Sequence, residues 1–502
     1  MDITLNELKT RLMEINDLNA AESVLSWDQN TYMPPGGAAA RGRQLATLSR
    51  LAHEKFTHSE IGGLLNDLRD YEESQPYDSY EASLIRITRR DYERAVKVPS
   101  AFVALLTEHA STTFQVWTEA RPANDFAKVR PFLEKTLELS RELSDFFPGY
   151  EHIADPLIDF ADYGMKASTV TKIFSELRRE LVPIVHAITA QEPADDTSLH
   201  QHFPEPLQWA FGMEVVRLFG YDTNRGRQDK SPHPFTTSFS VGDVRITTRI
   251  HENNLSEALF GTMHEAGHAM YEQGIDPAFE GTPLANGTSS GVHESQSRLW
   301  ENLVGRSRGF LEHFYPQLKK VFPAQLGNVS LEKFYRAINK VSPSLIRVEA
   351  DEVTYNLHVL LRFDFELQML EGTLEVRDLP DAWRERFKAD LGIAPSDDRN
   401  GVLQDIHWYF AQIGGMFQGY TLGNIMGAQF FEAALRAHPE IPDEISKGKF
   451  DTLHEFLREN IYRHGSVYTA EELVKRVTGN PLTIAPYIRY LRKKYGEIYE
   501  LE

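Results

Sequence analysis

The sequence contains no cysteine among its 502 residues. Disulfide bonds and thiolate metal sites are therefore excluded, and any metal ion would have to be held by His, Asp or Glu side chains. No stretch of about 18 uninterrupted apolar residues occurs, so we expect no membrane-spanning helix. The N-terminus, MDITLNELKTRLMEI, is charged and amphipathic and lacks the apolar core of a secretory signal. These absences favour a cytoplasmic protein without a membrane partner.

Basic residues are also scarce. The 53 Lys and Arg residues are outnumbered by 73 Asp and Glu residues, which gives a formal net charge of −20, and no long basic run occurs. Proteins that bind nucleic acid present a basic face, so we expect no nucleic-acid partner. Apolar residues, by contrast, are plentiful: 41% of the chain is hydrophobic and 11% is aromatic. That content supports a large packed core and excludes a disordered protein.

Most of the chain has apolar residues at helical spacing. One stripe over residues 4–24 comprises Leu5, Leu8, Leu12, Ile15, Leu18 and, just beyond, Leu25. The turn TYMPPGG at residues 31–37 ends this helix, and further helical patterns cover residues 38–53, 80–145, 168–190 and 205–219. No long linker, internal repeat or low-complexity tract interrupts them. We predict a mainly α fold in which residues 1–502 form a single domain, an arrangement compatible with two helical lobes flanking a cleft.

One segment departs from the helical pattern. PHPFTTSFSVGDVRITTRI, residues 232–250, is rich in Thr, Val, Ile and Phe and is divided by Gly242 and Asp243. This composition predicts two short strands joined by a tight turn. The hairpin could be purely structural, or it could form the edge of an active site, because a histidine motif follows it directly.

That motif lies in GTMHEAGHAM, residues 261–270, within a predicted helix over residues 255–273. Asn254 is a favourable N-cap, Glu257 three residues later nearly completes a capping box, and Gly274 suits the end of the helix.

His264 and His268 are four residues apart, so they share one helix face with Cβ atoms about 5–6 Å apart. Both imidazoles could therefore reach one ion at about 2.0–2.1 Å. Glu265 is rotated by about 100° from His264 and is better placed to act as a general base on water held by the metal. The alternative is that the two histidines are ordinary surface or core residues.

A third ligand is available in NGTSSGVHESQSRLWENLVG, residues 286–305. Ser289 or Ser290 would cap a helix that ends near Gly305, with Glu294 in its first turn. On its own, Glu294 would be interpreted as an acidic residue that favours the positive helix N-terminus. The upstream histidine pair favours a ligand instead. Arg298, four residues after Glu294, could orient its carboxylate, and Glu301 lies beyond.

Two histidines, a glutamate and a neighbouring base are suited to amide hydrolysis. The metal would polarise the water and the scissile carbonyl, while Glu265 would take the water's proton and pass it to the leaving amine. A Tyr or His across the cleft would be needed to stabilise the developing oxyanion.

The chain resembles the M32 metallocarboxypeptidases, the thermostable carboxypeptidase type, over its full length. Six short motifs in order carry the resemblance: HPF at 233–235, D-x-R-x-T at 243–247, HEAGH at 264–268, HESQ at 293–296, I-R-x-x-A-D at 346–351 and G-x-x-Q-D-x-H-W at 401–408.

The resemblance implies a helical, cleft-bearing fold similar to neurolysin and angiotensin-converting enzyme, and a homodimer. It implies removal of single residues from peptides with a free C-terminus, with broad side-chain tolerance and poor action on proline. It further implies one divalent metal per chain, with Zn²⁺ favoured and Co²⁺ or Mn²⁺ as alternatives. By the family pattern the ligands are His264, His268 and Glu294, and the catalytic base is Glu265.

A carboxypeptidase must recognise the α-carboxylate of its substrate, and an arginine offers a bidentate fork for it. Arg347 lies near the start of a predicted helix that Ser342 caps and Pro343 opens. Arg347 could equally well form an ion pair with Asp351, four residues later, instead of binding the substrate. Arg245 on the hairpin is the other candidate, and the two arginines could share the function.

The remaining motif residues each have two interpretations. His233 and His407 could donate to the oxyanion or to the substrate backbone, or could be buried histidines that hold the cleft together. Tyr420 could be an oxyanion donor or a core aromatic residue. Asp405 could hydrogen-bond a ligand histidine from behind, whereas Trp300 and Trp408 are expected to pack in the core.

Two other functions compete with a metallocarboxypeptidase. A metallo-oligoendopeptidase on a similar fold would use the same ligands without a carboxylate clamp, and Arg347 and Arg245 argue against it. A non-catalytic helical binding protein is disfavoured because the three predicted ligands and Glu265 are all present.

Overall fold

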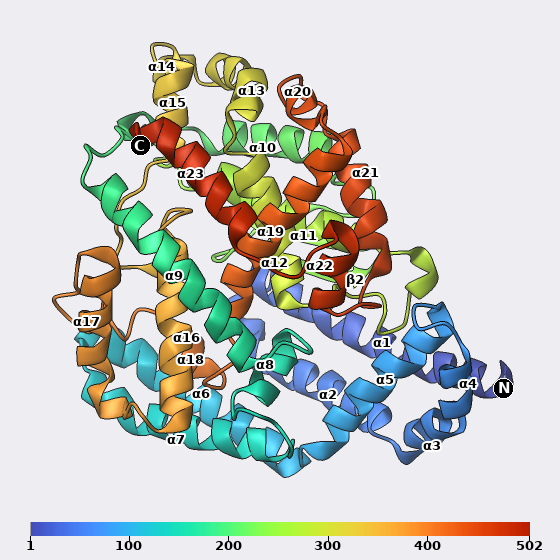
Figure 1. Cartoon of the computed structure of the whole chain (residues 1–502). Helices are drawn as coiled ribbons and strands as arrows, with labels where there is room; N and C mark the ends of the chain where they lie inside the picture. The colour runs from blue at the N-terminus through green and yellow to red at the C-terminus, as the bar shows by residue number, and fades with distance from the viewer. Residues whose placement is uncertain (1, 502) are drawn as a thin grey trace.

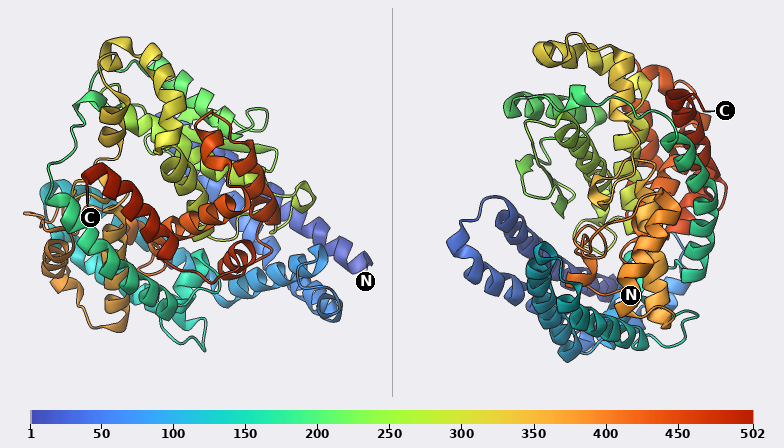
Figure 2. Two further views of the ribbon diagram at one scale, coloured as in Figure 1. Left: turned by 45° about the horizontal axis from the view of Figure 1, so that its top comes forward. Right: turned by 90° about the vertical axis from the view of Figure 1, so that its left-hand side faces the viewer.

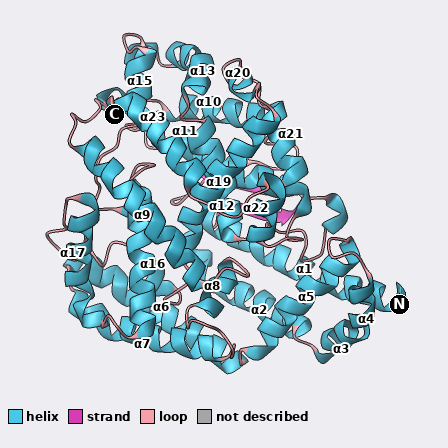
Figure 3. Cartoon of the chain, viewed as in Figure 1, coloured by secondary structure: helices cyan, strands magenta, loops and turns pink. Residues whose placement is uncertain are grey.

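The computed structural model describes residues 2–501 and consists largely of helices, together with one small sheet (Figures 1 and 3). This arrangement confirms the predicted mainly α fold. The two chain ends lie on different sides of the molecule, and α9 and α23, which are far apart in sequence, pack side by side (Figures 1 and 2).

The N-terminal helices build a small apolar core of their own. Leu5, Leu8 and Leu12 pack there against Ile61 and Leu84. The predicted first helix is confirmed and continues to the double-proline turn, which a short 3₁₀ helix follows. The elements are α1 (Asp2–Thr31), η1 (Pro35–Gly37), α2 (Ala38–Phe56), α3 (Ser59–Asp67), α4 (Arg69–Ser74) and α5 (Tyr80–Lys97).

The next helices confirm the patterns predicted over residues 80–145, 168–190 and 205–219. Their buried stripes, such as Val129, Leu133 and Leu137, enter the main apolar core of the molecule. The elements are α6 (Ser100–Ala123), α7 (Phe126–Asp145), α8 (Asp155–Ala161), α9 (Ala167–Thr189), η2 (Thr197–Leu199) and α10 (Glu205–Phe219).

The predicted hairpin is also confirmed. Strands β2 (Thr236–Ser240) and β3 (Asp243–Thr248) are antiparallel, with Thr236 opposite Ile246. A third strand, β1 (Gln228–Lys230), pairs parallel to β3, so the sheet order is β1-β3-β2. Its three residues, QDK, carry no apolar signal, and the sequence pattern did not predict it. Strand β2 therefore forms an edge of the sheet.

The remaining elements contribute to the main core, and α11 packs directly against the sheet. They are α11 (Leu255–Gln273), η3 (Pro277–Phe279), α12 (Ser290–Arg298), the π-helix η4 (Leu299–Val304), α13 (Arg308–Val321), α14 (Pro323–Leu326), α15 (Leu331–Ile338), η5 (Arg347–Glu349), α16 (Tyr355–Glu371), η6 (Val376–Asp378), α17 (Leu379–Leu391), α18 (His407–Phe410), α19 (Gln418–Ala437), α20 (Ile441–Ile445), α21 (Asp451–Asn460), η7 (Tyr462–His464), α22 (Ala470–Thr478) and α23 (Ala485–Tyr499).

Helices α11, α12 and α19 lie together at the centre of the molecule (Figure 1). Two glycines allow this close packing. A Cβ atom on Gly267 would lie 2.7 Å from the carbonyl oxygen of Gln296 on α12, and one on Gly423 of α19 would lie 2.6 Å from the Cβ of Glu294. Larger residues would force the three helices apart, so both glycines fix the position of α12 relative to its neighbours.

The helix predicted to start at Ser342 and Pro343 does not form. The backbone N–H of Ser342 instead donates to the Asp351 carboxylate at 3.0 Å, and Asp351 also accepts the backbone N–H of Val353 at 2.9 Å. These bonds hold residues 341–346 as an irregular loop, and Arg347 falls in the short 3₁₀ helix η5.

Among residues 2–501, no helix combines the length and the apolar character needed to cross a membrane.

Candidate active site

Helix α11 begins and ends where the sequence predicts. The Asn254 side chain accepts the backbone N–H of Ser256 at 3.1 Å, so Asn254 is a true N-cap. The predicted capping box is wrong, however. The Glu257 carboxylate does not turn back to the cap but lies 2.5 Å from the Nδ1 atom of His251 and pairs with Arg249, and both partners belong to the chain entering the helix.

The side chains of His264, His268 and Glu294 converge between α11 and α12. One ligand atom from each lies within 4.8 Å of the others. The Glu294 Oε2 atom is 3.7 Å from Nε2 of His264 and 3.5 Å from Nε2 of His268. Three ligands bound at about 2.0–2.1 Å to one tetrahedral ion would be separated by about 3.4 Å. The three residues therefore fit a single metal ion, and their nitrogen and oxygen atoms suit a divalent one.

Charges around Glu294 keep it ionised. Burial alone would raise the pKa of this carboxyl, but the Arg298 guanidinium and the two histidines bring it well below its usual range. The Nε atom of Arg298 donates to Oε1 at 2.7 Å, as the i+4 spacing predicts, which leaves Oε2 directed at the histidines.

Each histidine is held from behind by a hydrogen bond to its Nδ1 atom. Nδ1 of His264 lies 2.9 Å from Oε2 of Glu301, and Nδ1 of His268 lies 2.8 Å from Nδ1 of His293. His293 in turn lies 2.5 Å from Glu272. Such partners fix the orientation of a ligand imidazole and turn its Nε2 atom toward the metal.

These contacts correct the role predicted for Asp405. Its carboxylate does not reach a ligand histidine, because Arg347, Arg362 and His407 surround it. The residue that supports His264 is Glu301, which lies in the π-helix that continues α12. Short π segments inside helices often occur at functional sites, where they redirect a side chain.

Glu265 lies beside the three converging residues on the sheet side of α11. Its side chain is 7% exposed, and burial raises the pKa of its carboxyl. Thr236 of the edge strand β2 donates its hydroxyl to Oε2 of Glu265 at 2.7 Å. The hairpin therefore borders the site, as one of its two interpretations predicted, and it fixes the orientation of Glu265.

A second cluster of polar side chains surrounds Asp405. Oδ1 of Asp405 is 2.5 Å from Nδ1 of His407, whose Nε2 atom is 3.3 Å from the Tyr420 hydroxyl. The Nε atom of Arg347 donates to Oδ2 of Asp405 at 2.5 Å, and its Nη1 donates to the Tyr355 hydroxyl at 2.9 Å. Arg347 thus pairs with Asp405 rather than with Asp351, so the alternative ion pair is not formed.

Tyr355 lies between this cluster and the candidate metal ligands. Its hydroxyl accepts a hydrogen bond from Arg347, and its ring centroid is 4.7 Å from the guanidinium of Arg298, which pairs with Glu294. Trp408 and Trp300 are buried in the core as predicted, at 4% and 0% exposure.

Arg245 and His233 are less closely connected to the site. Arg245 is paired with Asp243 and stacks 4.4 Å from the ring centroid of Trp27 on α1. Its neighbour Ile246 is opposite Thr236, and side chains alternate along a strand, so Arg245 projects from the sheet face opposite Glu265. The His233 side chain is exposed in the loop between β1 and β2.

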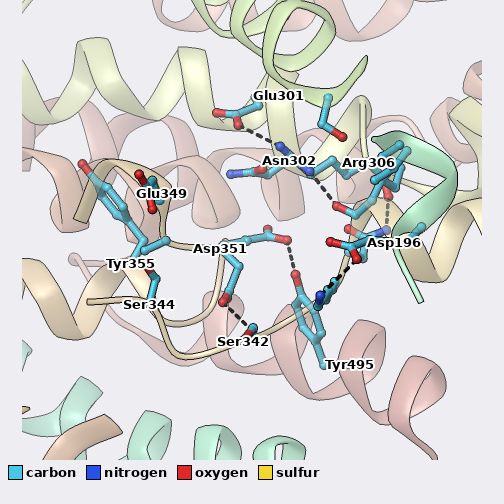
Figure 4. Close-up of a pocket in the computed structure, with 18 of the residues that line it drawn as sticks. Asp196, Glu301, Asn302, Arg306, Ser342, Ser344, Glu349, Asp351, Tyr355 and Tyr495 are labelled. Atoms are coloured by element: carbon cyan, nitrogen blue, oxygen red, sulfur yellow. Dashed lines mark hydrogen bonds and ion pairs between the residues drawn. The ribbon is translucent and has the colours of Figure 1, made fainter. Parts of the chain in front are cut away.

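A polar pocket of about 450 Å³ adjoins the ligands. Arg298 and Glu301, which contact the candidate ligands, line this pocket together with Tyr355, Asp196 and Glu349. Figure 4 shows the pocket with Glu301, Tyr355, Glu349 and Asp196 labelled. The pocket therefore borders the residues that support the candidate metal ligands, and its lining includes neither Glu265 nor Arg347.

The sequence model of the family described as Carboxypeptidase Taq (M32) metallopeptidase matches residues 7–495. The chain belongs to this family. Thermostable carboxypeptidase 1 of Thermus thermophilus is 41% identical over 487 residues, which cover 95% of each chain. Carboxypeptidase 1 of Bacillus subtilis is 34% identical over 491 residues, which cover 98% of this chain and 97% of that one.

Among solved structures, the M32 carboxypeptidase of Deinococcus radiodurans matches with a TM-score of 0.97 and 47% identity, covering 99% of this chain and 100% of that one. Metallocarboxypeptidase 1 of Trypanosoma cruzi matches with a TM-score of 0.92 and 32% identity, covering 99% and 100%. The predicted family is confirmed, and membership implies a divalent metal. The function is that of a metal-dependent carboxypeptidase, and the endopeptidase and binding-protein alternatives are not favoured.

Replacing Glu301 by Gln tests the support of His264 in this M32 enzyme. The amide keeps the shape of the side chain but removes the charge that fixes the imidazole, so we expect metal affinity to fall by about 10- to 100-fold. Titration of the metal-free protein with buffered Zn²⁺ measures this change. Glu349→Gln, at an exposed carboxylate of the same pocket, is the matched control and should leave the affinity unchanged. Equal affinities for both variants would contradict the assigned role.

Proposed function

We propose that this metallocarboxypeptidase releases single residues from the C-termini of peptides with one zinc ion held by His264, His268 and Glu294. The convergence of these three side chains beside the buried Glu265 is the observation that carries the proposal. When bound, the ion supplies a Lewis acid that polarises water and the scissile carbonyl. Zinc accepts this nitrogen and oxygen donor set, while Co²⁺ and Mn²⁺ are alternatives that the same ligands could hold.

Glu265 acts as the proton carrier in this mechanism. Thr236 holds Oε2, and we assign Oε1 to the reaction. A carboxyl whose pKa is raised by burial is a stronger base than an exposed one, so it can take a proton from water and return it to the leaving amine.

Donors opposite Glu265 stabilise the oxyanion. Burial raises the pKa of the Tyr420 hydroxyl, so it stays protonated and can donate a hydrogen bond. Asp405 orients His407 beside it, and we assign both side chains to the oxyanion or to the substrate backbone. His233, on the exposed loop before β2, is assigned to the backbone of the substrate.

Arg347 binds the α-carboxylate of the substrate in this proposal. Arg347 is 7% exposed, and its guanidinium lies among Tyr355, Tyr420 and Asp405, one tyrosine away from the Arg298–Glu294 pair. Arg245 is the second candidate, and its position across the sheet from Glu265 makes it better suited to a contact farther along the substrate.

Further properties come from the family resemblance. We propose a cytoplasmic homodimer whose chains each form a single domain with two helical lobes flanking the cleft. We also propose broad tolerance for the C-terminal residue, with poor action on proline.

The proposed reaction is tested with an N-acetylated peptide, which excludes attack at the amino end. The zinc-loaded protein should produce a ladder of peptides shortened one residue at a time, read by mass spectrometry, together with free amino acids. A chelator should stop the ladder, and added Zn²⁺ should restore it. Internal fragments as the first products would contradict the proposal.

A further inference from the structure

Two arginines share one buried carboxylate, that of Asp405. Arg347 donates to Asp405 through Nε at 2.5 Å and Nη2 at 3.3 Å, and Arg362 donates through Nε at 3.0 Å. Both arginines also use the same oxygen of Gln404: the backbone N–H of Arg347 donates to it at 2.9 Å and Nη2 of Arg362 at 3.0 Å. Arg362 is 0% exposed, so it cannot touch a substrate.

This cluster carries an excess of positive charge. Burial lowers the pKa of Arg362 to about 10, which still leaves it protonated at neutral pH. Although burial opposes ionisation, Arg362 and Arg347 hold the pKa of Asp405 well below its usual range. The nearby Glu366 contributes no negative charge at pH 7, because burial raises its pKa to about 8. Two guanidinium groups therefore face a single carboxylate.

Arg347 keeps hydrogen-bond donors that the cluster does not use. The contacts of Arg347 to Asp405 and Tyr355 use three of the five N–H donors of a guanidinium. Among residues 2–501 the two other N–H groups, one on each Nη atom, donate to no protein acceptor. These two N–H groups are available to an anionic group, and a carboxylate is the partner that arginine favours.

From this arrangement we infer that Arg362 is a positioning residue for recognition of the substrate's C-terminal carboxylate. Arg362 offsets the charge of Asp405, so Arg347 keeps a net positive charge for the substrate. Arg362 also helps to hold the Arg347 backbone, because both bind the same oxygen of Gln404. A buried charge without a partner is costly, and the substrate carboxylate supplies that partner. The inference rests on the proposed role of Arg347.

Replacing Arg362 by Met removes the excess charge and keeps an unbranched side chain, although a shorter one. A unit charge about 7 Å away, at an effective dielectric constant of about 20, changes the binding of an ion by roughly 10- to 50-fold. We expect KM for a free-acid peptide to rise by that factor, and the Ki of the released amino acid to rise with it. The change in kcat should be much smaller. Arg362→Lys, which keeps the charge, should recover most of the loss.

A second variant separates charge from packing. Adding Asp405→Asn to Arg362→Met removes the carboxylate as well, so the net positive charge beside Arg347 returns. KM and Ki should then move back toward the starting values, although kcat falls because His407 loses its partner. If Arg362 only stabilised the fold, KM and Ki would be higher in the double variant than in Arg362→Met alone, because each change would remove further hydrogen bonds.

The outcomes distinguish this inference from the proposed function. Thermal melting first shows which variants fold. If Arg362→Met does not fold, KM and Ki are compared between the original protein, the double variant and Arg362→Lys. If Arg347→Met leaves KM and Ki unchanged, the role proposed for Arg347 is wrong. If Arg347→Met raises both and folded Arg362 variants raise neither, the inference is overturned and the proposed function stands.

Discussion

Replacing Glu265 by Gln is expected to lower kcat by about 10²- to 10⁴-fold while leaving the metal bound. Gln keeps the shape of the side chain and can still accept the Thr236 hydroxyl bond, but it cannot take a proton from water. Because Glu265 is not among the three converging side chains, metal content should not change. Steady-state kinetics with a free-acid peptide and metal analysis of the same sample measure both quantities.

Glu257→Gln is the matched control for this prediction. Glu257 lies in the first turn of the same helix and pairs with Arg249 and His251 outside the ligand cluster. Its replacement should leave kcat close to the original value. Retained turnover in the Glu265 variant, at full metal content, would show that another group is the base.

Replacing Glu294 by Gln is expected to lower metal affinity by more than about 100-fold, which is a larger decrease than the one predicted for Glu301→Gln. Glu294 supplies both the third ligand atom and the negative charge between the two histidines. The amide retains an oxygen but not the charge, and a charged ligand contributes much of the affinity for a divalent ion. After dialysis the variant should hold almost no metal, and its activity should fall to background.

Thermal melting of the Glu294 variant provides the internal check. Arg298 keeps its second partner, Glu301 at 3.1 Å, so the metal-free variant should still fold. The original protein should melt at a higher temperature when zinc is present, because a ligand that binds only the folded state stabilises it, and the variant should lose this shift. Full metal content in the variant would exclude Glu294 as a ligand.

The parts of the site that follow from local periodicity could be predicted from the sequence. The face shared by His264 and His268 needs only the four-residue spacing of a helix. The same holds for Arg298, whose contact with Glu294 the spacing indicated and the structure confirms. The hairpin was recognisable because strand residues surround one tight turn.

The parts that depend on distant segments were missed or misassigned. Asp405 meets arginines that lie 58 and 43 residues away, so no local pattern shows that they surround its carboxylate. The support of His264 by Glu301 depends on a π-helix, which helical periodicity does not reveal. His293 is part of the HESQ motif, but the sequence does not show that it contacts His268 on one side and Glu272 on the other.

The most direct test of the account compares two peptides that are identical except at the C-terminus, one a free acid and the other an amide. Both are incubated with the zinc-loaded protein, and kcat/KM is measured for release of the last residue. If Arg347 binds the C-terminal carboxylate, the free acid should be processed at least about 100-fold more efficiently, because the amide leaves a buried positive charge without a partner. Equal rates on both peptides, or cleavage at internal bonds, would contradict the assignment of a carboxypeptidase with an arginine clamp.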